Sequence, residues 1–179
     1  MQISDTLENF VTKWRAYHND PLPSMPFDPQ WPSLCFDAID PQPGEILNWQ
    51  PTKQTPASDM FIRLGEALDT KIHPDIAEYF SCYWSDHLNA RAPAGDLVLL
   101  QVWNEEDLER LRANYIGHAM VKAKQKQPLS LFFACTEPDD GMLTVRNDDG
   151  SIWLEYPGKK PVKQIADNLC DFINQLSPR

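Results

Sequence analysis

Residues 95–126 read GDLVLLQVWNEEDLERLRANYIGHAMVKAKQK, and this stretch decides the fold of the chain. Leu97–Trp103 is almost entirely apolar and rich in strand-favouring residues, which predicts a strand buried on both faces. Asn104 then suits a helix N-cap, and Asp107 stands three positions later, as in a variant of the capping box. A buried strand is therefore expected to lead directly into a long helix, with carboxylates at the junction.

The helix after this junction is expected to bury one stripe of residues at helical spacing: Leu108, Leu111, Tyr115, Ala119 and Ala123. Acidic residues in its first turn and lysines in its last turn complement the helix dipole. Gly117 costs about 1 kcal/mol relative to alanine inside a helix, which predicts close packing against the sheet or a local bend. His118 is interpreted as a helix histidine bonded to a neighbouring group.

Size and charge restrict the class of protein. The 179 residues suit one domain spanning 1–179, and 26 acidic against 16 basic residues give a net charge of −10. This charge opposes binding to nucleic acid or anionic lipid, and suits either a basic partner or simple solubility. No signal sequence and no apolar run of about 20 residues is present. Four scattered cysteines are expected to be reduced core thiols of a cytoplasmic protein.

The N-terminal part combines a helix with a long irregular segment. Residues 4–18 predict an amphipathic helix capped by Ser4. Residues 19–52 contain eight prolines and no Lys or Arg, with apolar residues spread throughout. They predict a loop wrapped over the core, with short extended pieces near 34–36 and 45–49. A loop of this length is more often functional than a short one.

The remaining elements predict an α+β fold with a mostly antiparallel central sheet covered by several helices. Helices are expected over 59–70, from Pro74 to about Leu88, and over 161–176, with a loop at 90–95. Strands are expected over 129–135, 142–145 and 152–156. The last two flank Asn147-Asp-Asp-Gly150, a strong hairpin signal.

Motifs for catalysis or metal binding are not found in the sequence. The histidines lack metal-ligand spacing, and no phosphate-binding glycine loop occurs. Cys35, Cys82 and Cys135 are interpreted as core residues rather than nucleophiles. Two interpretations apply to Trp49, Trp84 and Trp103: they anchor a partner at the surface, or they pack in the core. Packing in the core is favoured. No catalytic site, metal or cofactor is expected, although a hydrolase with a cysteine or a carboxylate pair remains an alternative.

Negative charge is concentrated before residue 110, in the loop over 19–52 and between Asp69 and Asp107. This concentration of acidic residues fits a solvated surface with helix capping, or a docking surface for a basic partner. Asp96 and the Glu105 group bracket one strand, so they are expected at opposite ends of the sheet unless the strand is short or bent.

Several motifs together resemble Syd, the SecY-interacting protein family of bacteria, over nearly the whole chain. They are Pro32-Ser-Leu-Cys35, Trp49-Gln-Pro51, Leu99-Leu-Gln-Val-Trp103-Asn-Glu-Glu-Asp107, Asn114-Tyr-Ile-Gly-His118, Leu131-Phe-Phe-Ala134 and Ile165-Ala-Asp-Asn-Leu169-Cys-Asp-Phe172-Ile-Asn-Gln-Leu176. The segment from Pro21 to Trp31 matches the family least well.

The resemblance implies a non-enzymatic protein of the SUKH superfamily that binds SecY on the cytoplasmic face of the inner membrane and acts in quality control or regulation of the translocation channel. It also implies a concave acidic surface for basic SecY loops. The net negative charge argues against nucleic-acid or direct lipid binding, and the chain is expected to be monomeric. The acidic residues within family-like motifs are Glu45, Asp86, Asp96, Glu105, Glu106 and Asp107. The alternative is an immunity or inhibitor protein whose acidic face neutralises a basic toxin.

Overall fold

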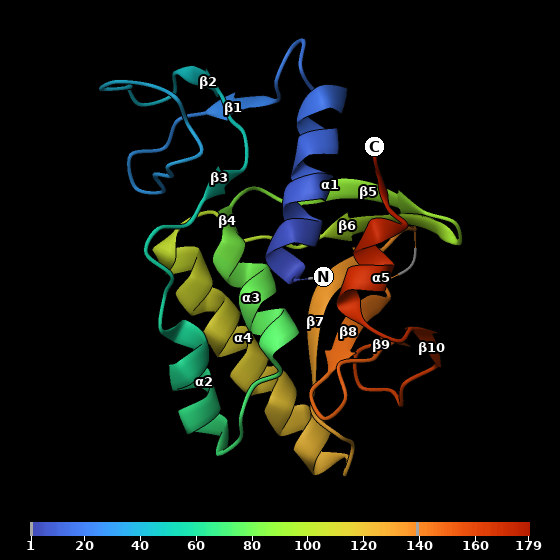
Figure 1. Ribbon diagram of the computed structural model, residues 1–179. Helices are drawn as coiled ribbons and strands as arrows, with labels where there is room; N and C mark the ends of the chain where they lie inside the picture. Colours follow the sequence, from blue (N-terminus) through green and yellow to red (C-terminus); the bar gives the residue numbers. More distant parts are fainter. Residues whose placement is uncertain (1, 139) are drawn as a thin grey trace.

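A computed structural model describes residues 2–138 and 140–179 of the chain (Figure 1). Within these residues an antiparallel seven-stranded sheet has the order β10-β9-β8-β7-β6-β5-β11. The predicted α+β fold with a mostly antiparallel sheet is confirmed. The strands are β5 (Leu88–Ala92), β6 (Gly95–Leu99), β7 (Ser130–Thr136), β8 (Met142–Arg146), β9 (Ile152–Glu155), β10 (Lys163–Ala166) and β11 (Ser177–Pro178).

The helices pack against one another and against the sheet around a continuous core. They are α1 (Ile3–Tyr17), α2 (Met60–Leu68), α3 (Pro74–Cys82), α4 (Glu105–Lys124) and α5 (Leu169–Asn174). α1 contacts α3, α5 and β11, and α2 lies along α4. Two short antiparallel pairs complete the fold: β1 (Ser24–Pro26) with β2 (Ile46–Asn48), and β3 (Thr52–Lys53) with β4 (Tyr83–Trp84). None of the described helices is both long and apolar enough to cross a bilayer.

The strand-to-helix junction forms with a shorter strand than the sequence predicts. β6 ends at Leu99, and its burial alternates, with Leu97 and Leu99 buried and Val98 only half-buried. The expected burial on both faces is therefore wrong for this strand. The predicted cap is confirmed, since the Asn104 side chain accepts a hydrogen bond from the Asp107 amide at 2.9 Å. Asp107 in turn accepts from the Trp103 amide at 2.8 Å.

Two expectations for α4 are wrong. Its last buried residue is Lys122, whereas Ala123 is exposed, so the buried stripe turns at the end of the helix. Gly117 is exposed, and a Cβ built there would meet nothing within 4 Å, so close packing does not require glycine. Ser4 likewise does not cap α1, because that helix begins after Gln2 without a side-chain cap.

Lys122 is turned inward by a buried polar network. Its ammonium group lies 2.7 Å from the carboxylate of Glu155, and the two side chains are 4% and 3% exposed. Gln127 accepts a second hydrogen bond from Lys122 at 3.0 Å, and Thr144 donates one to Glu155 at 2.9 Å. Burial lowers the pKa of the neighbouring His118, against the opposing effect of the Glu155 charge. The network thus joins α4 to β8 and β9.

The end of α3 differs from the prediction because of a contact from a distant segment. The helix begins at Pro74 as expected but ends at Cys82, well before Leu88. The Gln54 side chain donates to the carbonyls of Phe80 and Tyr83 at 2.8 and 3.0 Å. These bonds take up carbonyls that would otherwise need partners at a helix end. The chain then continues as β4, and 88–92 pairs with β6 in place of the expected loop.

The C-terminal helix is also shorter than predicted. Residues 163–166 form β10 on the edge of the sheet, and only Leu169–Asn174 is helical. Asn168 caps α5 by accepting from the Asp171 amide at 2.8 Å. This Asn-x-x-Asp pattern repeats the cap of α4, so the sequence did contain a signal for the helix start.

Alanine is expected to have opposite effects at two glycines. Gly117→Ala should stabilise the protein by about 0.5–1 kcal/mol, because it improves helix propensity at an exposed site. Gly150→Ala should destabilise it by about 1–3 kcal/mol, because its φ is +76° and a Cβ would lie 2.6 Å from the His73 ring. Urea denaturation measures both changes.

Gly158→Ala is the control for backbone strain alone. Gly158 has φ +72°, and the nearest atom to a Cβ built there would be 4.0 Å away. A destabilising Gly117→Ala, or a Gly150→Ala that costs no more than the control, would contradict the expectation.

Candidate functional site

The acidic loop over 19–52 folds back onto the start of α4. Figure 1 shows its β1–β2 pair at the upper left, away from the sheet and beyond the first turn of α4. The Ser33 hydroxyl donates to the Trp103 carbonyl at 2.7 Å. The side-chain amide of Asn104 donates to the Pro32 carbonyl at 2.8 Å. The residue that caps α4 therefore also holds the loop. The indole of Trp103 donates to the Trp31 carbonyl at 3.2 Å.

These contacts enclose a hollow that we term the Trp103 pocket, with a volume of about 280 Å³. Its walls include Pro32, Leu34, Trp84, Trp103, Asn104 and Glu105. Trp84 and Trp103 are 8% and 6% exposed, and Trp49 is 5% exposed, which confirms the predicted core position of these three tryptophans. Glu105 is the charged residue among the lining side chains.

A second, smaller cavity of about 180 Å³ also includes Trp103 in its wall. Its lining includes Asp86, Asp107 and Arg110. The guanidinium of Arg110 lies 4.8 Å from the centroid of the Trp31 ring and 3.8 Å from the Asp107 carboxylate. The positive charge of Arg110 therefore offsets part of the negative charge of this cavity.

Glu105 and Glu106 differ from the other acidic residues at the junction. Both are exposed in the first turn of α4, and within the described part of the chain neither has a cation within ion-pair distance. The N-terminal end of the helix dipole stabilises them by about 0.3–1 kcal/mol each. Asp107 is held by the cap, and Asp86 accepts a hydrogen bond from the His87 amide at 2.8 Å.

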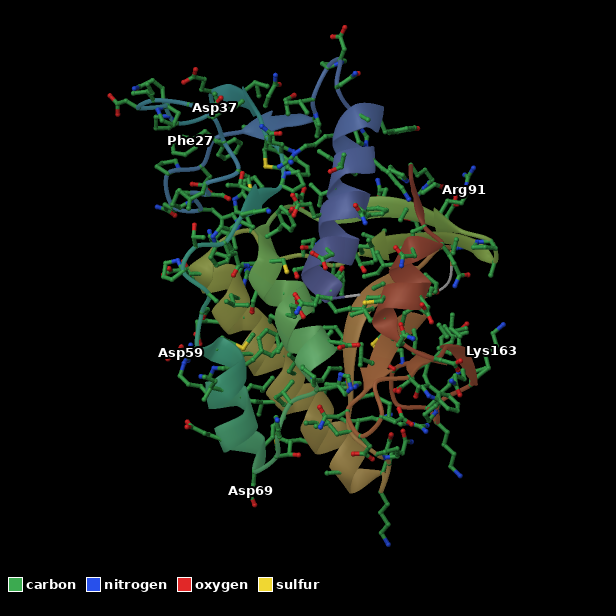
Figure 2. The ribbon with its side chains drawn as sticks, in the orientation of Figure 1. Phe27, Asp37, Asp59, Asp69, Arg91 and Lys163 are labelled. Carbon is green, nitrogen blue, oxygen red and sulfur yellow. The ribbon has the colours of Figure 1, made fainter. Side chains whose placement is uncertain are left out.

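Two of the predicted partner-binding residues lie apart from this junction. Asp96 lies in the β5–β6 hairpin, 2.6 Å from Arg91 and 3.6 Å from Arg179. The hydrogen bond from Arg91 lowers the pKa of Asp96. Figure 2 shows Arg91 across the molecule from Asp37 of the acidic loop. Glu45 lies on the loop itself, where its carboxylate accepts from the Gln42 amide at 2.9 Å. The six carboxylates thus do not form one continuous cluster.

Sequence reasoning missed Leu34 as a surface residue. Its side chain is 69% exposed at the Trp103 pocket, although the spread of apolar residues in the loop was expected to pack on the core. Ile39 and Ile46 of the same loop are 101% and 64% exposed. The signal available in the sequence was their position beside Asp37, Asp40 and Glu45, since isolated apolar residues among charges tend to remain at the surface.

The structure gives little support to nucleophilic or acid–base chemistry. Burial raises the pKa of Cys35 and of Cys82 to about 11, which favours the unreactive thiol at neutral pH. Asp96, Glu109 and Asp149 have lowered pKa values because arginine or serine side chains donate hydrogen bonds to them. Among the described residues, no group of three His, Cys, Asp or Glu side chains is placed to hold a metal ion.

Comparison with known proteins finds one family along the chain. Residues 1–178 match the family described as Syd protein (SUKH-2). Protein Syd of Alteromonas mediterranea is 40% identical, over 99% of this chain and 97% of the relative. Protein Syd of Pseudoalteromonas atlantica is 36% identical, over 98% and 96%. Protein Syd of Colwellia psychrerythraea is 33% identical, over 98% and 92%.

Proposed function

Because this chain belongs to the Syd family, we propose that it is a non-enzymatic protein that docks on the basic cytoplasmic loops of SecY. The observation that carries the proposal is the first turn of α4, where Glu105 and Glu106 are exposed and have no ion-pair partner among the described residues. Charged groups of this kind can pair with Lys or Arg of a partner without first breaking an internal contact.

The charge of the whole chain supports attachment to the membrane through a protein. Cytoplasmic loops of membrane proteins are enriched in Lys and Arg. A chain with a net charge of −10 is attracted to such loops and repelled by the anionic leaflet around them. We therefore propose peripheral association with the cytoplasmic face of the inner membrane, with a role in quality control or regulation of the translocation channel.

The proposed docking face centres on the junction between the acidic loop and α4. Glu105, Glu106 and Asp86 form its centre, and Asp107 contributes negative charge while it holds the helix cap. Glu45 lies apart from this centre, on the acidic loop itself. Asp96 lies outside the docking face, since two arginines already neutralise its carboxylate.

Changing Glu105 and Glu106 to glutamine is expected to weaken binding to SecY in nanodiscs by about tenfold. Exposed ion pairs contribute roughly 0.2–1 kcal/mol each, so losing two pairs of about 0.7 kcal/mol corresponds to this factor. The free energy of unfolding should fall only modestly, since Asn104 and Asp107 still cap the helix. Surface plasmon resonance gives the affinity, and urea denaturation gives the stability.

The matched control is Glu66→Gln with Asp69→Asn, which removes the same charge from exposed residues of α2 and its C-cap. Asn suits Asp69 because this residue has φ +50°, a conformation that Asn tolerates. Equal binding by both double variants would contradict docking through α4. Pull-down from detergent-solubilised membranes separates the proposal from its alternative, since recovery of a basic toxin in place of SecY would support an immunity protein.

A further inference from the structure

The Trp103 pocket is held open by its own internal bonds. Its walls come from the acidic loop and the α4 junction, which Ser33 and Asn104 join by hydrogen bonds of 2.7 and 2.8 Å. The Ser33 hydroxyl also accepts from the Cys35 amide at 3.1 Å. Trp84 is fixed by pairing with Thr52 and by a bridge to Val102. A hollow with such fixed walls can receive a group at a low cost in conformational entropy.

The size of the pocket limits what it can hold. Sites for drug-sized ligands and cofactors typically have volumes of roughly 300–1,000 Å³. The Trp103 pocket has about 280 Å³ and an apolar lining that includes two tryptophans, a proline and a leucine. It therefore fits one apolar side chain better than a cofactor.

Charge and exposure indicate the sequence context of that side chain. Glu105 contributes to the lining of the pocket and has no cation within ion-pair distance among the described residues. Asp86 and Asp107 line the adjoining cavity, which shares Trp103. Leu34 is 69% exposed at the pocket and offers apolar surface beside these carboxylates. A group that fills the pocket thus has a carboxylate within reach of its neighbour in sequence.

We infer that the Trp103 pocket receives an apolar side chain that stands next to a Lys or Arg in an extended segment of the partner. The apolar side chain fills the hollow, and the basic neighbour pairs with Glu105. This inference rests on the proposed docking function and adds sequence specificity to it. The protein then distinguishes among basic loops by an apolar residue, whereas charge alone would treat them equally.

Two peptides of equal charge test the inference on the full chain. The probes are fluorescently labelled Gly-Lys-Leu-Arg-Lys-Gly and Gly-Lys-Ser-Arg-Lys-Gly, blocked at both ends. The leucine peptide is expected to bind about tenfold more tightly, since burying a leucine side chain has an effect of this order or larger. Fluorescence anisotropy gives the affinities, and the indole N–H resonances of Trp84 and Trp103 should shift with the leucine peptide.

Leu34→Ser should bring the preference down to threefold or less, because it removes apolar surface at the pocket without changing charge. Ile39→Ser is the matched control, since Ile39 is an exposed apolar residue of the same loop outside the pocket lining. It should leave the preference intact.

Equal binding of the two peptides would overturn the inference, and so would a failure of both peptides to bind. An equal loss of preference in the two serine variants would also overturn it. Binding of the parent to SecY in nanodiscs is measured in parallel. If the peptide test fails but the parent still binds SecY, only the inference about the apolar side chain is rejected. If the parent does not bind SecY, the proposed function is rejected as well.

Discussion

Replacing Lys122 by methionine is expected to lower the free energy of unfolding by about 3–5 kcal/mol, because it leaves the Glu155 carboxylate buried without its cation. The two side chains are 4% and 3% exposed and lie 2.7 Å apart. Thr144 would remain as a hydrogen-bond donor to Glu155, which is not enough to neutralise a buried charge. Urea denaturation at pH 8 measures the loss.

The double variant Lys122→Met with Glu155→Leu provides the control. Replacing a buried ion pair by apolar residues is often close to neutral, so the double variant should be more stable than Lys122→Met alone. Additive effects of the two substitutions would contradict this account.

Association with SecY in nanodiscs is expected to slow by tenfold or more as NaCl rises from low concentration to several hundred millimolar. Exposed charges are screened over about 8 Å at physiological ionic strength. The docking face contains exposed carboxylates on a chain of net charge −10, so electrostatic attraction should act mainly on the association rate. Stopped-flow fluorescence or surface plasmon resonance follows this rate across the salt series.

Empty nanodiscs of anionic lipid are the control, and little binding to them is expected because the chain and the lipid surface are both negative. A contact dominated by apolar burial would hold or strengthen in a salting-out salt such as sulfate. A flat response to NaCl, or equal binding to empty discs, would rule out docking through the acidic face.

The features that the sequence by itself determined depend on residues close to one another in the chain. The cap of α4 needs only Asn104 and Asp107, three positions apart. The β8–β9 hairpin follows from the Asn147–Gly150 turn between two apolar segments. α1 follows from its apolar stripe. These interactions form within a few residues, so the local pattern is enough to predict them.

The sequence predicts where carboxylates gather near the start of α4 but not how they are arranged. The sequence identified carboxylates at the start of α4, and the structure leaves Glu105 and Glu106 exposed there. Asp96 could not be separated from them in advance, because one of its two arginines is Arg179 at the end of the chain. The Trp103 pocket was not predicted, since its walls come from residues near 33, 84 and 104 that only the fold brings together.

Tertiary structure decided where elements end and which side chains turn inward. Residues 83–88 and 161–168 continue helical patterns, yet α3 ends where Gln54 binds its last carbonyls, and 163–166 pairs with β9. Lys122 is buried because Glu155, 33 residues later, supplies the opposite charge. A periodic pattern shows which face of a segment is apolar. Backbone hydrogen bonds and buried charges are satisfied by whichever partners the fold brings near, and those partners are distant in the sequence.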